Sequence, residues 1–485
     1  MPAAILYWSS LPPGVLWWDE AEAQAVLYLG GIFHPTGFPT YAIAGWIFTH
    51  AFPVGEVAWR ASFFSALVVA TAVGLSAIAA RKLGATTSAA IITALALATA
   101  TGVWRYATRP GVQSFAMLAV AVMFTCLLSK RPIAAAGAAG LALATHPVTV
   151  WLLPGAFLAA LGTGVERPRW RITLGFCALA FFGGLSLYAY LPIRSAIITA
   201  AHVDPTASLP VSYHPIWDYD HPASVAGFVR VLSGSDYAAG NQLRSIPDPV
   251  HYLAYARVFA VTMLGGYRWI GVILALVGLG TLWARTPIVA IGLFVATFGV
   301  FPFSIIYHAS QPEKYYLSPL WVVALPVAVG VTALAQQIAR FARIGGIIPS
   351  LLLVAVIALN VRSALAGETF LAWRPWHEDH QTWLEQRSDR RAEAFIDEVR
   401  RHTPDDAIIA ARWTLATPLY YAAYVKHELG NRRIVTNIDA VQLATLEQLH
   451  PLYYFDNLWQ GFDPRTVAGT PVAGVQPQLF RFGRQ

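Results

Sequence analysis

The feature that most constrains this chain is a series of long apolar runs. A helix needs about 20 mostly apolar residues to cross a bilayer, where its backbone groups must find partners within the helix. Only 12% of the residues are charged, whereas soluble domains average about 25%. The sequence therefore predicts an all-α polytopic membrane protein, and excludes a soluble single-core enzyme, a disordered chain and a nucleic-acid-binding protein. The ten runs lie near residues 58–80, 86–103, 112–128, 132–145, 148–165, 172–193, 269–284, 286–306, 316–337 and 344–364.

Basic residues in the turns between these runs predict the orientation of the chain. Cytoplasmic turns of membrane proteins carry an excess of Lys and Arg. If the first run leads inward, ten basic residues fall inside and three fall in the short outer turns. The +7 net charge then reports orientation and not a polyanionic partner. The inside set is Arg81, Lys82, Lys130, Arg131, Arg167, Arg169, Arg171, Arg285, Arg340 and Arg343, and the outside set is Arg105, Arg109 and Lys314.

This orientation divides the chain into three parts. Residues 1–57 form a truncated first span and a first extracytoplasmic loop, and residues 58–365 hold about ten transmembrane helices with a long outer loop at 194–268. Residues 366–485 form a small extracytoplasmic α/β cap, with strands at 406–411 and 432–435 and helices at 384–402 and 415–429. The first ten residues are too short to cross a bilayer, so we expect a full-length version with eleven spans and a cytoplasmic N-terminus. Cys126 and Cys177 lie in apolar runs, which indicates small buried thiols and not a disulfide.

The segment 17–41 contains the residues best suited to chemistry. Asp19, Glu20 and Glu22 follow an aromatic pair, Trp17 and Trp18, that is typical of a membrane interface. Carboxylates at bilayer depth cost about 2.5–3.5 kcal/mol each, so they tend to be paired or functional. Asp19 with Glu22 also resembles a capping arrangement at the start of a helix over 20–29, and the two roles are compatible.

A turn with two prolines and two glycines follows that helix and carries His34. A histidine beside proline is as often structural as functional, and we retain it as a candidate substrate-binding residue. In the outer loop 194–268, Asp and His residues occur without the close spacing of a zinc site. We therefore expect no metal cofactor, although a divalent cation bridging an acid and a phosphate stays open.

The motifs of residues 17–67 resemble a family of multi-span proteins of the GT-C glycosyltransferase type. The resemblance rests on Asp-x-x-Glu, then Gly-Ile-x-His-Pro-Thr-Gly-Phe-Pro-x-Tyr, then VAWRASFFSAL at 57–67. It continues more loosely at THP (145–147), LPIR (191–194), DHP to GSDY (220–237) and PEKYYLSP (312–319). That family includes bacterial proteins of unknown function and the animal endoplasmic-reticulum enzyme that O-mannosylates IPT domains.

The resemblance implies transfer of mannose or another hexose from a polyprenyl-phosphate carrier to a hydroxyl of a protein or glycan, on the extracytoplasmic side of a bacterial plasma membrane. An inverting transfer needs a carboxylate that removes the acceptor proton. Asp19 stands at the place of the family's catalytic Asp, so we predict it as the base, with Glu22 as an orienting group or substitute base. A leaving phosphate needs cations and hydrogen-bond donors. The candidate substrate-binding residues are His34, Arg60, Arg109, His146, Arg194, Tyr237, Lys314 and Tyr315.

Two other classes of function are compatible with this sequence. A transporter or flippase for a lipid-linked substrate would line a path through the bilayer with charges, in two related halves. A non-catalytic membrane assembly factor would use the outer cap for binding. The acidic residues instead gather in the first outer loop, which favours the transferase.

Overall fold

The computed structural model describes residues 2–163, 170–211, 214–235, 249–307, 311–366, 384–455 and 469–483. These residues form two compact units, each made of segments far apart in the sequence. The first unit comprises Met1–Ser10, Ser65–Tyr188 and Asp236–Gln386, and the second comprises Leu11–Phe64, Ala189–Ser235 and Arg387–Gln485. The first loop and the C-terminal region, which the sequence analysis lists as separate parts, thus belong to one unit.

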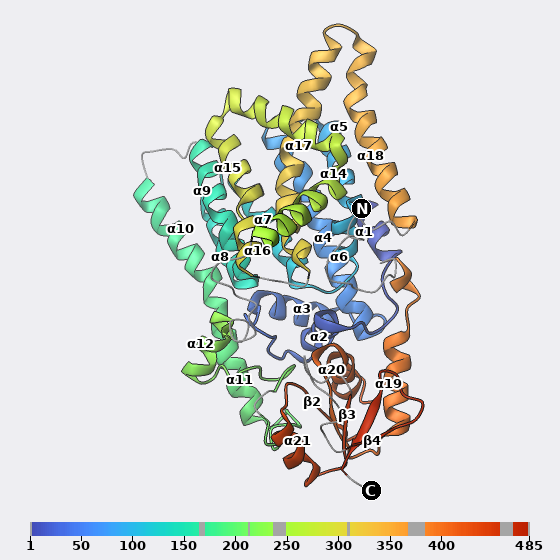
Figure 1. Cartoon of the computed structure of the whole chain (residues 1–485). Helices are drawn as coiled ribbons and strands as arrows, with labels where there is room; N and C mark the ends of the chain where they lie inside the picture. Colours follow the sequence, from blue (N-terminus) through green and yellow to red (C-terminus); the bar gives the residue numbers. More distant parts are fainter. Residues whose placement is uncertain are drawn as a thin grey trace. The chain divides into compact units, whose positions relative to one another are not determined.

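The first unit is a helical bundle (Figure 1). Within the described residues, each apolar run predicted from the sequence lies mostly in helix. The unit contains α1 (Pro2–Trp8), most of α4 (Val57–Lys82), α5 (Thr87–Thr99), α6 (Thr101–Ala107), α7 (Val112–Leu128), α8 (Pro132–Thr145), η1 (Pro147–Leu152), α9 (Leu153–Gly162), α10 (Trp170–Leu185), η3 (Ser186–Ala189), α14 (Pro249–Arg285), α15 (Pro287–Phe298), α16 (Phe301–Ile306), η4 (Pro312–Tyr316), α17 (Leu317–Ala339), η5 (Arg343–Ile347) and α18 (Ile348–Leu365).

Six helices in the described residues are long and apolar enough to cross a membrane, and a seventh is added if α5 and α6, bent by 67°, form one span. The chain is therefore an integral membrane protein of mostly helical fold. The remaining runs give shorter apolar helices, Val112–Leu128, Pro132–Thr145 and Pro147–Gly162. The figure of about ten spans stays a prediction that depends on these three helices.

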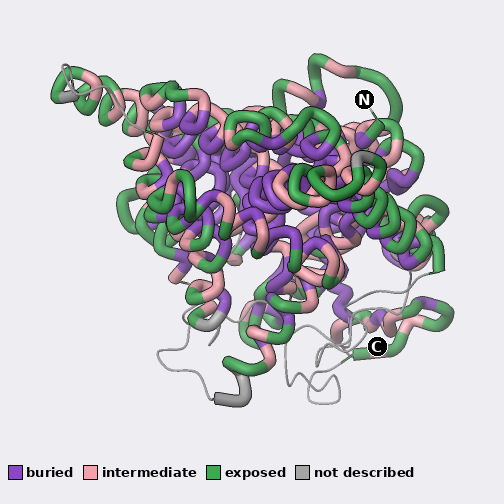
Figure 2. Tube along the Cα trace, turned by 90° about the horizontal axis from the view of Figure 1, so that it is seen from above, coloured by how far each residue is buried: buried purple, intermediate pink, exposed green. Residues whose placement is uncertain are grey.

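Glycines allow the helices of the bundle to approach closely. A Cβ on Gly278 of α14 would lie 1.8 Å from the Pro326 carbonyl oxygen of α17, and one on Gly330 would lie 1.9 Å from the Leu274 oxygen. Gly155 of α9 and Gly292 of α15 meet in the same way. Small residues at helix contacts are favoured in membranes, where packing and not the hydrophobic effect holds helices together. Figure 2 shows buried stretches where helices pack and exposed stretches on their outer sides.

The second unit combines helices from three regions with a sheet. Its helices are α2 (Trp18–Leu29), α3 (Pro39–Ala51), α11 (Tyr190–Ala200), α12 (Val225–Ser233), α19 (Arg391–His402), α20 (Trp413–Tyr420), the π-helix η7 (Tyr421–Val425) and α21 (Ala440–Glu447), and it also holds the start of α4. The short helix η6 (Glu385–Arg387) has residues in both units. α2 packs against α3 of the first loop and also against α20 and η7 of the C-terminal region.

The sheet confirms the predicted small C-terminal α/β fold. Its five strands run in the order β2-β1-β3-β5-β4. β1 (Ile408–Ala410) pairs in parallel with β2 (Arg433–Val435) and β3 (Leu452–Phe455), whereas β5 (Leu479–Phe482) pairs antiparallel with β3 and with β4 (Gly469–Pro471). Leu209 of the outer loop joins the buried core of this sheet. β1 and β2 match predicted strands, and β3 to β5 were not predicted.

Candidate functional site

The candidate site is built on α2, a helix with Ala at positions 21, 23 and 25. Alanine has the highest helix propensity, and Gly30 ends the helix in the left-handed conformation at φ 63°. The residue before the helix is Trp17, and no side chain caps its first turn. Asp19 therefore lies inside the first turn and does not cap the helix. The helix dipole favours a negative charge in that turn.

Glu22 lies one turn after Asp19 on the same side of α2 and is fully buried. Both of its carboxylate oxygens contact His34, whose backbone N–H donates to Oε1 at 2.8 Å and whose Nδ1 contacts Oε2. Burial raises the pKa of Glu22, and the neighbouring His34 opposes that shift. Glu22 is thus a buried carboxylate that fixes the ring of His34.

The turn that carries His34 is held from the other side by α11. Gly37 has a φ of 80°, and a Cβ on it would lie 2.8 Å from both methyl groups of Leu191. The Gly37 N–H donates to the His34 carbonyl oxygen at 2.9 Å. Only glycine fits this backbone conformation at so close an approach. The position of His34 is therefore set by α2 and α11 together.

Asp19 is partly exposed, and its Oδ1 accepts a hydrogen bond of 3.1 Å from the indole Nε1 of Trp413, the first residue of α20. One ligand atom from each of Asp19, Glu22 and His34 lies within 4.8 Å of the other two. Two carboxylates and an imidazole at this separation can pass or hold a proton, and they can also hold a cation. The structure thus brings together three residues that the sequence analysis proposed.

The two arginines proposed in the same unit have backbone partners. Arg60 donates to the carbonyl oxygens of Gly55 and Thr49 at 3.0 and 2.9 Å. Arg194 donates to the carbonyl of Gly30 and, at 3.1 Å, to that of Leu29. These two carbonyls lie at the C-terminal end of α2, whereas Asp19 lies at its start. Arg194 thus satisfies open carbonyls at the end of a helix.

The proposed residues of the first unit form a second group around an aromatic ring. The ring centres of His146 and Tyr315 are 5.6 Å apart, and Lys314 Nζ lies 5.7 Å from the centre of the Tyr315 ring. Arg109 Nε donates to Gln386 Oε1 at 2.6 Å. Tyr237 lies outside the described residues.

Sequence reasoning missed two residues that lie beside the proposed ones in space or along the chain. Trp413 is 394 residues from Asp19, and no motif marks it. Glu313 is buried and accepts a hydrogen bond of 2.8 Å from the Tyr106 hydroxyl. Its position in the PEKYY segment, next to Lys314, was the available signal.

Comparison with known proteins agrees with the resemblance seen in residues 17–67. Residues 19–183 match the family model described as the Protein O-mannosyl-transferase TMEM260 N-terminal domain. The chain is 22% identical to Protein O-mannosyl-transferase TMEM260 of Mus musculus over 91% of its length, and spans 61% of that relative. It is 35% identical to Protein O-mannosyl-transferase tmem260 of Dictyostelium discoideum over 66 residues, 13% of this chain and 8% of the relative.

The fold matches a solved structure over the whole chain. The crystal structure of ArnT from Cupriavidus metallidurans bound to undecaprenyl phosphate aligns with a TM-score of 0.57 at 14% identity, covering 100% of this chain and 98% of that one. At this identity the match shows the fold alone. The expected GT-C architecture is confirmed. Residues 19–183 are thus similar to the TMEM260 N-terminal domain, and the chain has an ArnT-like GT-C fold with a small mixed sheet near its C-terminus.

Proposed function

We propose that this protein is an integral-membrane glycosyltransferase that moves a hexose from a polyprenyl-phosphate carrier to an acceptor hydroxyl on the extracytoplasmic side. The observation that carries the proposal is the grouping of Asp19, Glu22 and His34, one of whose acids is partly exposed while the other is fully buried. The relatives named O-mannosyltransferases support the reaction class, and the ArnT structure bound to undecaprenyl phosphate supports the carrier class. The acceptor is a protein Ser/Thr hydroxyl or a glycan hydroxyl.

In the proposed reaction Asp19 acts as general base. Its carboxylate takes the proton of the acceptor hydroxyl while the hydroxyl oxygen attacks the anomeric carbon. The bond from that carbon to the phosphate oxygen breaks, and the polyprenyl phosphate leaves with the bonding electrons. Glu22 holds His34 in one orientation for contact with the substrate.

The burial of Glu22 favours an inverting over a retaining reaction. A retaining enzyme needs a second carboxylate about 5–5.5 Å from the first, free to attack the sugar. One oxygen of Asp19 and one of Glu22 lie within 4.8 Å of each other, so distance alone does not exclude a nucleophilic role for Glu22. Glu22 is nevertheless fully buried, with both oxygens engaged by His34. It is therefore placed to orient and not to attack.

The test is a transfer assay with purified protein, polyprenyl-phosphate hexoses and a panel of peptide and glycan acceptors, read by mass spectrometry. We expect wild-type transfer, and a loss of about 10²–10⁴-fold in kcat for Asp19→Asn, the usual contribution of a general base. Glu20→Gln is the matched control, because it makes the same charge change in the same turn on another side of α2. Absence of wild-type transfer with every donor would contradict the proposed function, and equal rates for the two variants would contradict the role of Asp19.

The same assay tests whether transfer requires a metal ion. Three ligand atoms within 4.8 Å of one another can hold a cation, whereas both Glu22 oxygens already have a partner in His34. We expect full transfer in excess chelator. A loss of activity that Mn²⁺ or Mg²⁺ restores would instead assign a cation to this group.

A further inference from the structure

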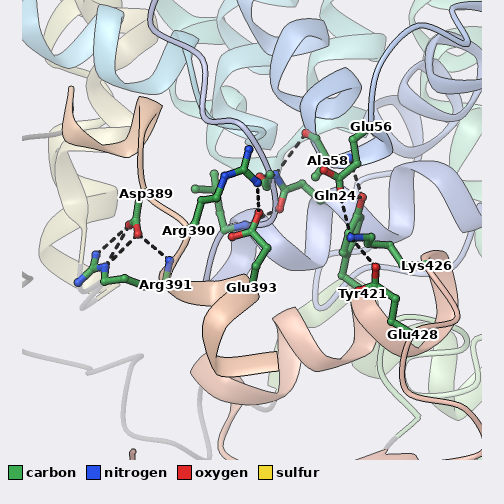
Figure 3. Close-up of polar contacts among 12 residues, drawn as sticks. Gln24, Glu56, Ala58, Asp389, Arg390, Arg391, Glu393, Tyr421, Lys426 and Glu428 are labelled. Carbon is green, nitrogen blue, oxygen red and sulfur yellow. Dashed lines mark hydrogen bonds and ion pairs between the residues drawn. The ribbon is translucent and has the colours of Figure 1, made fainter. Parts of the chain in front are cut away.

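The C-terminal domain touches the first loop through a set of polar contacts shown in Figure 3. The Tyr421 hydroxyl accepts a hydrogen bond of 2.8 Å from the Ala58 N–H and lies 3.4 Å from Glu56 Oε1. Lys426 Nζ lies 3.4 Å from the same Glu56 oxygen and 2.7 Å from Glu428. These contacts join η7 and the residues after it to the start of α4.

The segment that leads into α2 is held by the same domain. The buried Gln24 side chain accepts from the Leu16 N–H at 2.8 Å and donates to the carbonyls of Gly14 and Ala58 at 3.1 and 3.2 Å. Glu393 of α19 packs on Gly14 so closely that a Cβ there would lie 1.8 Å from its Oε1. Trp17 packs on Phe395, with ring centres 5.4 Å apart. Gly14 and Trp17, which precede α2, therefore lie against α19 of the C-terminal domain.

Trp413 is the C-terminal side chain that reaches Asp19 itself. It opens α20, is half-buried, and donates its indole N–H to Asp19 Oδ1 at 3.1 Å. Its ring lies edge to face with those of His34 and Tyr219, at 6.1 and 6.5 Å between centres. An indole N–H can only donate, at any pH. The bond thus fixes one carboxylate oxygen and favours the ionised form of the acid.

We propose that Trp413 is a positioning residue for Asp19, so that the C-terminal domain completes the catalytic centre instead of only covering it. The inference rests on the proposed function, because it assigns Asp19 as the base. Trp413 orients the carboxylate and sets the pH range in which it accepts a proton. A domain that served only to dock the acceptor would not need a donor to the acid.

The experiment compares Trp413→Phe with Trp217→Phe in the full-length protein. Trp217 is the matched control, since it lies in the same unit, packs 5.8 Å from the Tyr424 ring, and has an indole N–H without a hydrogen-bond partner among the described residues. We expect Trp413→Phe to lower kcat by about 10- to 100-fold, the usual effect of losing a charge-assisted hydrogen bond, with little change in donor KM. We also expect the acidic limb of its pH–rate profile to move to higher pH. Equal kcat and equal pH profiles for the two variants would overturn the proposal.

A second measurement keeps the contact testable if no transfer is found. Protein labelled with fluorotryptophan gives a Trp413 signal, identified by its loss in Trp413→Phe, that fluorine NMR can follow. We expect this signal to shift as the acid is titrated in wild type and to stay constant in Asp19→Asn, while the Trp217 signal is unchanged in both. A Trp413 signal that titrates equally in both proteins, or in neither, would overturn the contact without bearing on the reaction class.

Discussion

At the scale of single residues, burial places two acids of one helix turn in different environments. Asp19 keeps part of its surface open, whereas Glu22 is fully buried and bound through both oxygens to His34. The i, i+3 spacing in the sequence places both acids on one side of a helix. The sequence could not tell which acid is buried, because that depends on the turn at His34 folding back onto α2.

The burial of Glu22 predicts a pH-dependent stability. Its pKa is raised in the folded state by burial, so between its ordinary value of about 4.5 and the raised value the folded protein holds a proton that the unfolded chain has lost. This contribution to stability is fully present below pH 4.5 and is lost as pH rises through the raised pKa. We expect Glu22→Gln to remove this loss of stability with rising pH, because Gln does not ionise. Its side-chain oxygen still accepts the His34 N–H.

Thermal unfolding in detergent over a pH series measures this effect. The Tm of Glu22→Gln relative to wild type should rise as pH increases from 4.5, and Glu20→Gln should show no such trend. A constant difference in Tm between Glu22→Gln and wild type across the series would contradict the assignment.

At the scale of elements, helix α2 carries the site and needs partners at both ends. The sequence predicted a helix over 20–29, and the structure gives Trp18–Leu29. Its C-terminal carbonyls accept from Arg194 and from the Tyr190 hydroxyl, both on α11. The LPIR motif predicts Arg194 as a phosphate-binding residue. In the structure Arg194 donates hydrogen bonds to carbonyls at the C-terminal end of α2.

Arg194→Ala should therefore lower stability more than it weakens donor binding. Removing donors to the Leu29 and Gly30 carbonyls should cost about 1–3 kcal/mol, seen as a lower Tm. Donor KM should change little. Arg230→Ala is the control, because Arg230 is exposed on α12 and 3.7 Å from Asp220, a pair of the kind that contributes about 1 kcal/mol at most. A large rise in donor KM with unchanged Tm would assign Arg194 to the phosphate instead.

At the scale of the whole molecule, the predicted orientation rests on the ten inside and three outside basic residues. It requires the short helix Val112–Leu128 to cross the membrane, and its 17 residues are at the lower limit for a span.

Labelling of single cysteines from one side of the membrane tests this orientation. With Cys126 and Cys177 replaced by Ser, a single cysteine at exposed Ala394 should react with an impermeant maleimide in spheroplasts, and one at exposed Thr87 only after lysis. The reverse pattern would contradict the orientation.

The sequence alone determined the apolar helices of this protein and the acids of its candidate site. Apolar runs specify spans because lipid offers backbone groups no other partner. The motif at 17–41 specified the acids, because a local pattern places them on one turn. The tertiary structure decided which residues surround them: Trp413 reaches Asp19 across 394 residues, Arg194 binds the end of α2, and Gly278 and Gly330 set a helix contact. Such contacts depend on how distant segments pack, and no local pattern in the chain records that packing.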